Sequence, residues 1–279
     1  MILLTASEID RILEEDIPLV DLTTEVLGLS GEGKITFISR EKGILCGTEE
    51  VESIFERLKI KTEYSLKSGD KIDKNQEIII GYGDVKALHK AWKISLNILE
   101  YMSGIATAAN KFVELAKSVN PYVTVVTTRK FMPMTKKFVL KAIMTGGASP
   151  HRISLSDTVL IFKQHLEFIS FEDVLKKSKE IKKKLGNKQI GIEVDTKEEA
   201  KRAIDSGFDF IQLDKWSIED IEEIVNYRNV NNPNTLIAVA GGINYNNVVE
   251  YAKTGIDIIV TTSLYWSKPL DMTAKIEKV

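Results

Sequence analysis

The second half of the chain alternates apolar, β-branched runs with charged segments of helical spacing. The expected strands lie at 123–128, 157–162, 190–194, 208–214, 236–240 and 256–262, and the expected helices between them at 171–185, 196–206, 217–228 and 244–254. Continuous apolar strands that alternate with helices predict a parallel sheet covered on both faces. Six or seven such units favour a barrel over an open sheet.

The first half has a different pattern. It predicts a helix at 6–15 capped by Ser7, a strand at 34–38, a helix at 48–58, and short strands with a Gly-Asp turn at 69–70 between 62 and 83. Residues 1–85 therefore indicate a small α/β domain with an antiparallel sheet. A long helix at 85–119 would join the halves, and we expect Ser103-Gly104 to interrupt it because glycine weakens a helix interior.

Composition narrows the class of protein. Hydrophobic residues make up 43% and the formal net charge is −2, which is ordinary for a globular protein and gives no global basic field for nucleic acid. The single cysteine, Cys46, favours a reducing compartment. The N-terminus lacks the pattern of a signal peptide, and no apolar run approaches the ~20 residues of a membrane span. We expect a cytoplasmic protein with no membrane or nucleic-acid partner.

Polar residues follow the predicted strands, where a parallel barrel carries its chemistry. Early strand ends are cationic, with Arg129, Lys130, His151 and Arg152, and Lys163 and His165 follow the run at 157–162. The middle strand ends carry the carboxylates Glu193 and Asp214. The last strand ends are small, with Gly241, Gly242, Thr262 and Ser263. Small strand ends before helix N-termini suit phosphate, and we expect Asn244 to cap the helix after the glycines. Carboxylates suit ribose hydroxyls or a diphosphate-bound Mg²⁺.

Taken singly, each of these residues has an ordinary structural interpretation. Arg129 could be a surface charge, Glu193 and Asp214 could be rim ion-pair partners, and His165 could be a structural histidine. Their co-occurrence at strand ends carries the hypothesis of an anion site. The sequence has no Ser-His-Asp order, no Cys/His metal spacing, no Walker loop and no strand-linked GxGxxG.

At these residues the chain resembles the quinolinate phosphoribosyltransferases (carboxylating nicotinate-nucleotide pyrophosphorylases). The matching segments, in the order and spacing of that family, are EDIPLVDLTTEVL (15–27), SREKGILCG (39–47), SLNILEYMSGIAT (95–107), TRK (128–130), GGASPHR (146–152), IEV (192–194), LDK (213–215) and GGI (241–243). The resemblance implies an N-terminal α/β sandwich domain, residues 1–106, and an incomplete, seven-stranded α/β barrel, residues 107–279, whose last helix could pack back on the first domain.

The resemblance also implies a reaction and an assembly. Quinolinate and 5-phosphoribosyl 1-diphosphate (PRPP) would give nicotinate mononucleotide, CO₂ and diphosphate, with Mg²⁺ and no organic cofactor. The enzyme would be a homodimer with its active site completed across the interface. By position, the resemblance assigns the acceptor to Arg129, His151 and Arg152, and PRPP to Lys130, Glu193, Asp214 and the glycines 241–242. It adds Lys93, Lys163 and His165 as further substrate-binding residues. Glu193 and Asp214 would also hold Mg²⁺.

Several positions depart from the family pattern. Phe162 stands at a cationic lysine position, Lys163 at the neighbouring aspartate, and Lys93 at an arginine. These departures resemble the ModD branch, pyrophosphorylases associated with molybdenum transport. Phe162 removes a positive charge from the acceptor pocket, and Lys163, as the next strand residue, would point to the opposite face.

Three functions therefore remain open. The first is phosphoribosyl transfer to an acceptor other than quinolinate. The second is a true quinolinate enzyme in NAD biosynthesis, in which Lys163 replaces the missing lysine. The third is a non-catalytic accessory protein of molybdate uptake that uses the pocket for an oxyanion; Lys130, Glu193 and Asp214 argue against it, because such a site has no use for carboxylates.

Overall fold

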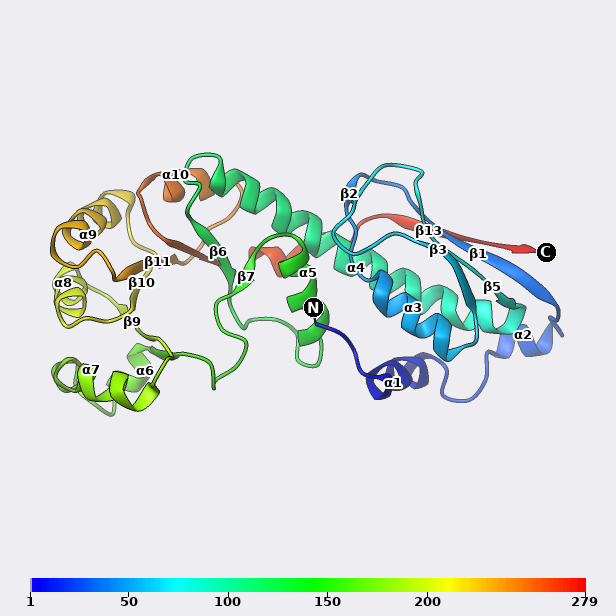
Figure 1. Ribbon diagram of the computed structural model, residues 1–279, viewed down its shortest axis with the longest axis horizontal. Coiled ribbons are helices and arrows are strands. Elements are labelled where there is room, and N and C mark those ends of the chain that lie inside the picture. The colour runs from blue at the N-terminus through cyan, green and yellow to red at the C-terminus, as the bar shows by residue number, and fades with distance from the viewer. Residues whose placement is uncertain (1) are drawn as a thin grey trace. The chain divides into compact units, whose positions relative to one another are not determined.

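A computed structural model describes residues 2–279, which form two compact units (Figure 1). One unit contains the chain up to Asn110 together with Phe131–Gly147 and Leu264–Val279. The other contains Lys111–Lys130 and Ala148–Ser263. We call them the N-terminal unit and the barrel unit. The domain boundary after residue 106 remains a prediction.

The N-terminal unit is built on an antiparallel sheet in the order β13 (Met272–Lys278), β1 (Glu32–Ser39), β5 (Glu77–Asp84), β3 (Lys61–Ser65). Helix α3 (Thr48–Arg57) and the N-terminal half of α4 (Val85–Lys117) pack against it (Figure 1). Their apolar faces bury Phe37, Phe55 and Leu99 completely. A side chain on Gly81 of β5 would lie 2.5 Å from the ring of Phe55, so this glycine lets the helix approach the sheet.

Smaller elements complete this unit: α1 (Ala6–Asp16), α2 (Leu22–Val26), the pair β2 (Gly43–Ile44) and β4 (Lys71–Ile72), and α5 (Lys136–Thr145). The expectation that Ser7 caps the first helix is wrong. Thr5 is the N-cap, and it forms a capping box with Glu8, whose carboxylate accepts from the backbone N–H of Thr5 at 2.7 Å. Ser7 lies inside the first turn.

Helix α4 runs without interruption through Ser103 and Gly104, contrary to expectation. A Cβ atom on Gly104 would lie 2.4 Å from the carbonyl oxygen of Lys268 and 2.9 Å from Cα of Pro269. The Ser103 hydroxyl accepts from the backbone N–H of Cys46 at 2.9 Å. Both residues are therefore small because other backbone segments pack against the helix here, and packing outweighs the weak helix propensity of glycine.

The expectation of a last helix is also wrong, because residues 272–278 form a strand, β13. Strand β13 pairs antiparallel with β1, from Gly33 opposite Lys278 to Ser39 opposite Met272. Met272, Ala274 and Ile276 alternate with polar residues, a period-two pattern that suits a strand with one packed face.

The barrel unit is a curled, incomplete barrel of seven strands that form parallel pairs. Their order is β7 (Ser149–Pro150), β6 (Thr124–Thr127), β12 (Ile258–Thr261), β11 (Leu236–Ala240), β10 (Phe210–Asp214), β9 (Ile190–Val194), β8 (Val159–Ile161). This confirms the predicted α/β class and the incomplete barrel. The two-residue strand β7 has no counterpart among the apolar runs, because it is too short to show a pattern.

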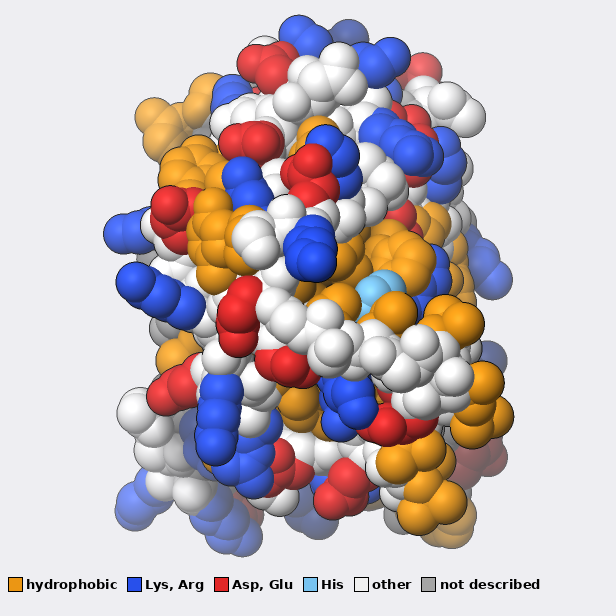
Figure 2. Space-filling model, turned by 90° about the vertical axis from the view of Figure 1, so that its right-hand side faces the viewer, with side chains coloured by type: hydrophobic (Ala, Val, Ile, Leu, Met, Phe, Trp, Pro, Cys, Tyr) orange, Lys and Arg blue, Asp and Glu red, His pale blue; other side chains and the backbone are white. Residues whose placement is uncertain are grey.

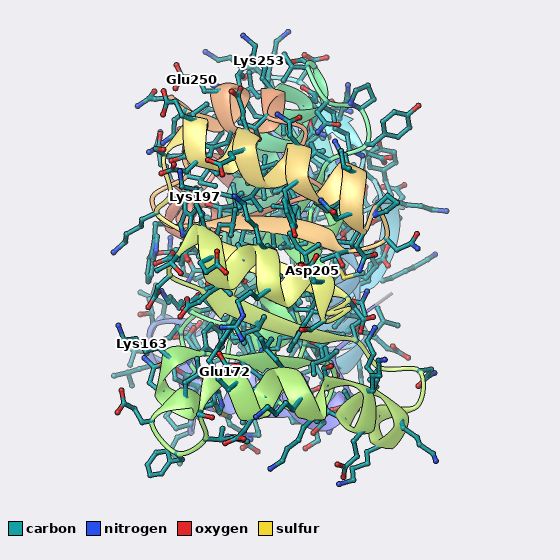
Figure 3. All side chains as sticks on the ribbon, turned by 90° about the vertical axis from the view of Figure 1, so that its left-hand side faces the viewer. Lys163, Glu172, Lys197, Asp205, Glu250 and Lys253 are labelled. Carbon is teal, nitrogen blue, oxygen red and sulfur yellow. The ribbon has the colours of Figure 1, made fainter. Side chains whose placement is uncertain are left out.

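Helices cover the outside of the barrel sheet: α6 (Lys163–Leu166), α7 (Phe171–Leu185), α8 (Lys197–Asp205), α9 (Ile218–Asn231) and α10 (Val248–Lys253), and the chain leaves the sheet through the 3₁₀ helix η1 (Ser263–Trp266). Figure 3 looks onto the layer of α7, α8 and α9. Lys197, labelled at the start of α8, pairs with Asp220 and Glu223 of α9, each at 2.9 Å. Such exposed pairs align the helices but add little stability.

The surface carries charges of both signs. On the face shown in Figure 2, basic and acidic side chains are interspersed, in keeping with the net charge of −2. In residues 2–279, no helix combines the length and apolar character needed to cross a membrane.

Candidate active site

A cavity of about 820 Å³ opens at the carboxyl ends of the barrel strands. Every residue that lines it belongs to the barrel unit. The lining side chains and backbone are those of Thr128, Arg129, Lys130, His151, Arg152, Leu160, Phe162, Gln164, Glu193, Gln212, Asp214, Lys215, Ala240, Gly241, Gly242, Ile243, Asn244, Val260, Thr261, Thr262 and Ser263.

The period of two along each strand decides which side chains face the cavity. In β10, Phe210, Gln212 and Asp214 point inward, whereas Ile211 and Leu213 are fully buried on the helix-covered face. An apolar cluster forms the floor: Val126, Leu160, Phe210, Ala238, Ala240 and Val260, with Phe162 packed against it. The polar groups above this floor are therefore held by rigid strands.

The guanidinium groups of Arg129 and Arg152 lie in one half of the cavity. Burial lowers the pKa of Arg152, and the positive charge of Arg129 lowers it further, while Asp157 partly offsets both. Next to Arg152, the pKa of His151 falls from 6.5 to about 4, first because of burial and then because of the Arg152 charge. The imidazole, whose ring meets Phe210 edge-on at 5.5 Å, is therefore neutral at physiological pH.

Phe162 forms part of the wall beside these cations. The guanidinium carbon of Arg152 lies 5.7 Å from the centre of the Phe162 ring. On α6, His165 stacks on the same ring at 6.1 Å, and its Nδ1 accepts from the backbone N–H of Phe162 at 3.0 Å. Lys163 does not line the cavity, and its exposed ammonium group lies 3.4 Å from the carboxylate of Asp195. Figure 3 shows Lys163 on the same side as Lys197, at the outer helix layer.

The other half of the cavity contains two carboxylates. Burial raises the pKa of Glu193, and the charges of Asp214 and Asp195 raise it further. The side-chain amide of Gln212, which is 6% exposed, donates to Glu193 at 2.6 Å, and this bond and the charge of Lys130 act in the opposite direction. Glu193 is therefore a carboxylate in a fixed position whose proton affinity is set by its neighbours.

The turn after β11 brings backbone into the cavity. Gly241 and Gly242 have φ angles of 93° and 77°, and Lys215 opposite them has 62°. A side chain on Gly241 would lie 2.7 Å from both Asp214 and the backbone nitrogen of Lys215, so only glycine fits. Asn244 does not cap the next helix as expected; α10 begins at Val248, and Asn244 donates to the carbonyl of Gly242 at 3.1 Å.

Hydroxyl groups connect the ends of the neighbouring strands β6 and β12. Thr128 and Thr262 lie 3.0 Å apart through their Oγ1 atoms. Thr261, which is buried, donates to the carbonyl of Ile243 at 2.9 Å, and its Oγ1 accepts from the backbone N–H of Ser263 at 3.1 Å. This network holds the last strand end against the glycine turn and leaves Thr262 and Ser263 at the cavity wall.

Most of the site residues expected from the sequence line this one cavity. Three of the expected residues do not: Lys163 and His165 belong to α6 outside the lining, and Lys93 is an exposed residue of α4 in the N-terminal unit. Sequence reasoning overlooked Gln212 and Lys215. The signal for Gln212 was available, since a polar residue two positions before Asp214 in the run FIQLD shares its face.

Among the described residues, no group of three or more His, Cys, Asp and Glu side chains could hold a metal ion. Glu193 and Asp214 by themselves supply two carboxylates. That number suits Mg²⁺, which keeps several waters and binds substrate phosphates together with one or two carboxylates.

Comparisons with known proteins agree with this geometry. The family model described as "Quinolinate phosphoribosyl transferase, C-terminal domain" matches residues 105–275, and that of the N-terminal domain matches residues 21–103. The chain belongs to this family. It is therefore a phosphoribosyltransferase, an enzyme of the pentosyltransferase class.

Relatives in this family carry two different names. A protein of Pasteurella multocida named "Putative pyrophosphorylase ModD" is 32% identical over 100% of this chain and 99% of its own length. One of Methanocaldococcus jannaschii named "Probable nicotinate-nucleotide pyrophosphorylase" is 34% identical over 95% and 94%. The solved nicotinate-nucleotide pyrophosphorylase of Ehrlichia chaffeensis is 27% identical, with a TM-score of 0.90 over 99% of this chain and 100% of its own.

Proposed function

We propose that this quinolinate phosphoribosyltransferase-family enzyme transfers the phosphoribosyl group of PRPP to an anionic aromatic acceptor other than quinolinate. The observation that carries this proposal is the wall formed by Phe162. An aromatic ring stands beside Arg152, and the next residue, Lys163, is paired with Asp195 outside the cavity. An acceptor pocket with a flat apolar wall favours a different charge pattern from that of a dicarboxylate.

The other half of the cavity supports PRPP as the donor. Backbone at Gly241 and Gly242 is accessible to phosphate oxygens, and the hydroxyls of Thr262 and Ser263 lie on the same side. Lys130 supplies a positive charge near Glu193. These are the groups that a phosphorylated ribose with a diphosphate requires, and they match the roles that the family resemblance assigns to them.

The residues of the chain would act by positioning and charge stabilisation. Lys130 would stabilise the charge on the leaving diphosphate, and Glu193 would stabilise the oxocarbenium-like ribose as the bond to diphosphate breaks. Gln212 fixes the Glu193 carboxylate for this role. Mg²⁺ bound to the diphosphate would neutralise charge there, with Glu193 and Asp214 as the residues to hold it. No covalent nucleophile is needed.

The proposal includes an assembly and a location. The active enzyme would be a cytoplasmic homodimer in which the N-terminal domain of one subunit closes the cavity of the other. Lys93, which is exposed on α4, would reach the acceptor in this way. Gel filtration with light scattering tests the dimer, and a Lys93→Ala variant that raises the KM of the acceptor without loss of the dimer would support the shared site.

Steady-state kinetics with PRPP, Mg²⁺ and quinolinate test the acceptor. We expect slow formation of nicotinate mononucleotide, together with PRPP binding that a Lys130→Ala variant weakens at least tenfold. Lys163→Ala serves as the matched control, because this lysine lies outside the cavity, and it should leave both measurements unchanged. Efficient turnover of quinolinate by the wild type would refute the altered acceptor.

Two alternatives are tested by the same measurements. Arg129, His151 and Arg152 in one pocket favour a true quinolinate enzyme, which would show efficient decarboxylating turnover. An oxyanion-binding accessory protein would bind molybdate more tightly than PRPP in parallel calorimetric titrations. The carboxylates Glu193 and Asp214 in the cavity argue against this last function, because they repel an oxyanion.

A further inference from the structure

We infer that the acceptor carries a single anionic group, and that this group stays on the ring after transfer, so that the reaction releases no CO₂. This inference rests on the proposed phosphoribosyl transfer and specifies the acceptor for the same cavity. It follows from the number and placement of charges in the acceptor half.

The positive charges of this half are concentrated at one point. Arg129 and Arg152 line the same cavity, and repulsion from Arg129 adds to burial in lowering the pKa of Arg152. One carboxylate between two guanidinium groups would relieve the repulsion and accept several hydrogen bonds from their fixed, planar forks. The pair is therefore matched to one anionic group.

The rest of the acceptor wall is uncharged. Leu160 and Phe162 are apolar, Gln164 is an amide, and burial keeps His151 neutral. A second carboxylate on a neighbouring ring atom would lose water against this wall and gain no cation from the wall in return. A planar ring edge without charge, in contrast, would be stabilised by contact with Leu160 and Phe162.

Among the described residues of the barrel unit, no other lysine supplies a charge to this wall. Lys163 is paired with Asp195 outside the cavity lining. Lys130 acts on Glu193, in the carboxylate half, and the Lys215 side chain lies against the turn at Gly241. The neutral wall beside the arginine pair is therefore a property of the folded site.

The reaction balances without decarboxylation. A pyridine-type ring nitrogen of the acceptor uses its lone pair to form a bond to C1′ of PRPP. The C1′–O bond to the diphosphate breaks, and its electron pair leaves with the diphosphate. The product is an N-ribosylated pyridinium that keeps its single carboxylate, so no carbon–carbon bond is cleaved.

The test compares pyridines that differ only in carboxylate number, with Mg²⁺ and PRPP. Nicotinate has one carboxylate, quinolinate has two adjacent ones, and nicotinamide has none. Diphosphate and CO₂ release are measured together. We expect the wild type to have a kcat/KM for nicotinate at least tenfold above that for quinolinate, to reject nicotinamide, and to release diphosphate without CO₂.

Variants at position 162 connect this preference to the structure. Phe162→Lys adds a cation to the wall and should move the nicotinate-to-quinolinate ratio at least tenfold toward quinolinate. Phe162→Leu keeps the wall apolar and should keep the preference for one carboxylate. Calorimetry of each acid with the PRPP-bound enzyme gives the same comparison if turnover is slow.

The outcomes separate this inference from the proposed function. Preference of the wild type for quinolinate, a ratio that Phe162→Lys leaves unchanged, or no binding of nicotinate to an enzyme that binds PRPP would each overturn the single-anion acceptor and leave phosphoribosyl transfer standing. Failure to bind PRPP at all would overturn the proposed function, and the inference with it.

Discussion

The buried lysine of the N-terminal unit provides a sharp test of the packing described above. Lys141 of α5 is 4% exposed, and its ammonium group lies 2.8 Å from Glu49 and 2.5 Å from Glu50, both of α3. Glu50 is only 3% exposed. Lys141→Met keeps most of the side-chain volume and removes the charge, so the buried Glu50 and the partly exposed Glu49 both lose their cation.

The expected loss of stability is large because the remaining charge stays buried. Breaking a buried ion pair by removing one partner costs about 3–5 kcal/mol. Lys137→Met is the matched control: it lies on the same helix and pairs with Glu8 at 2.7 Å, but it is 40% exposed. That exposed pair should contribute little to the free energy of unfolding. Adding Glu50→Gln to Lys141→Met should restore part of the loss, because it removes the more deeply buried charge.

Urea unfolding at pH 7, followed by circular dichroism, measures these differences. A loss below about 1 kcal/mol for Lys141→Met, or an equal loss for Lys137→Met, would refute the reasoning on burial. The pH dependence gives a second check. Burial alone would raise the pKa of Glu49, but hydrogen bonds from Lys141 and Ser68 outweigh it and lower this pKa from 4.5 to about 2. The contribution of this pair is thus complete above pH 4.5 and is lost as the pH falls toward 2, so the gap between wild type and Lys141→Met should narrow over that range.

Three further predictions concern the helix contact and the site. Gly104→Ala should destabilise the protein by about 1–3 kcal/mol in thermal unfolding despite the better helix propensity of alanine, because the new Cβ meets backbone; a stabilised variant would contradict the close approach. His151 should titrate near pH 4 by NMR. Because its ordinary pKa is 6.5, its contribution to stability is complete above pH 6.5 and is lost as the pH falls toward 4. His151→Asn should reduce this pH dependence. Gln212→Leu removes the hydrogen bond that lowers the pKa of Glu193, so the acid limb of the kcat/KM profile should move to higher pH, and an unmoved limb would exclude this coupling.

The sequence predicted the barrel well because its strands are buried on both faces. The runs at 190–194 and 236–240 coincide with β9 and β11, and the helix at 171–185 coincides with α7. A buried parallel strand is mostly apolar and an exposed helix is amphipathic, so both leave a pattern in one short window. The ends of these strands then gave Arg129, Glu193, Gly241 and the other residues that line the cavity.

Local pattern failed where distant segments decide the structure. Ser103 and Gly104 suggested a break, but their size reflects the backbone at 268–270 that packs against α4. The C-terminal segment became strand β13 because β1 offers it a free edge, and β1 is more than two hundred residues away in the chain. No window of the sequence contains both partners of such a contact.

The candidate active site also has features that the sequence predicts and features that depend on distant segments. By itself the sequence determined the family, the barrel and the residue types at its strand ends, because each is written in short motifs and periodic runs. Only the tertiary structure decided that Lys163 lies beside Asp195 outside the cavity lining, that Gln212 fixes Glu193, and that His151 is neutral. The physical reason is that direction, burial and charge coupling depend on neighbours from other strands, which the chain brings together only when the barrel forms.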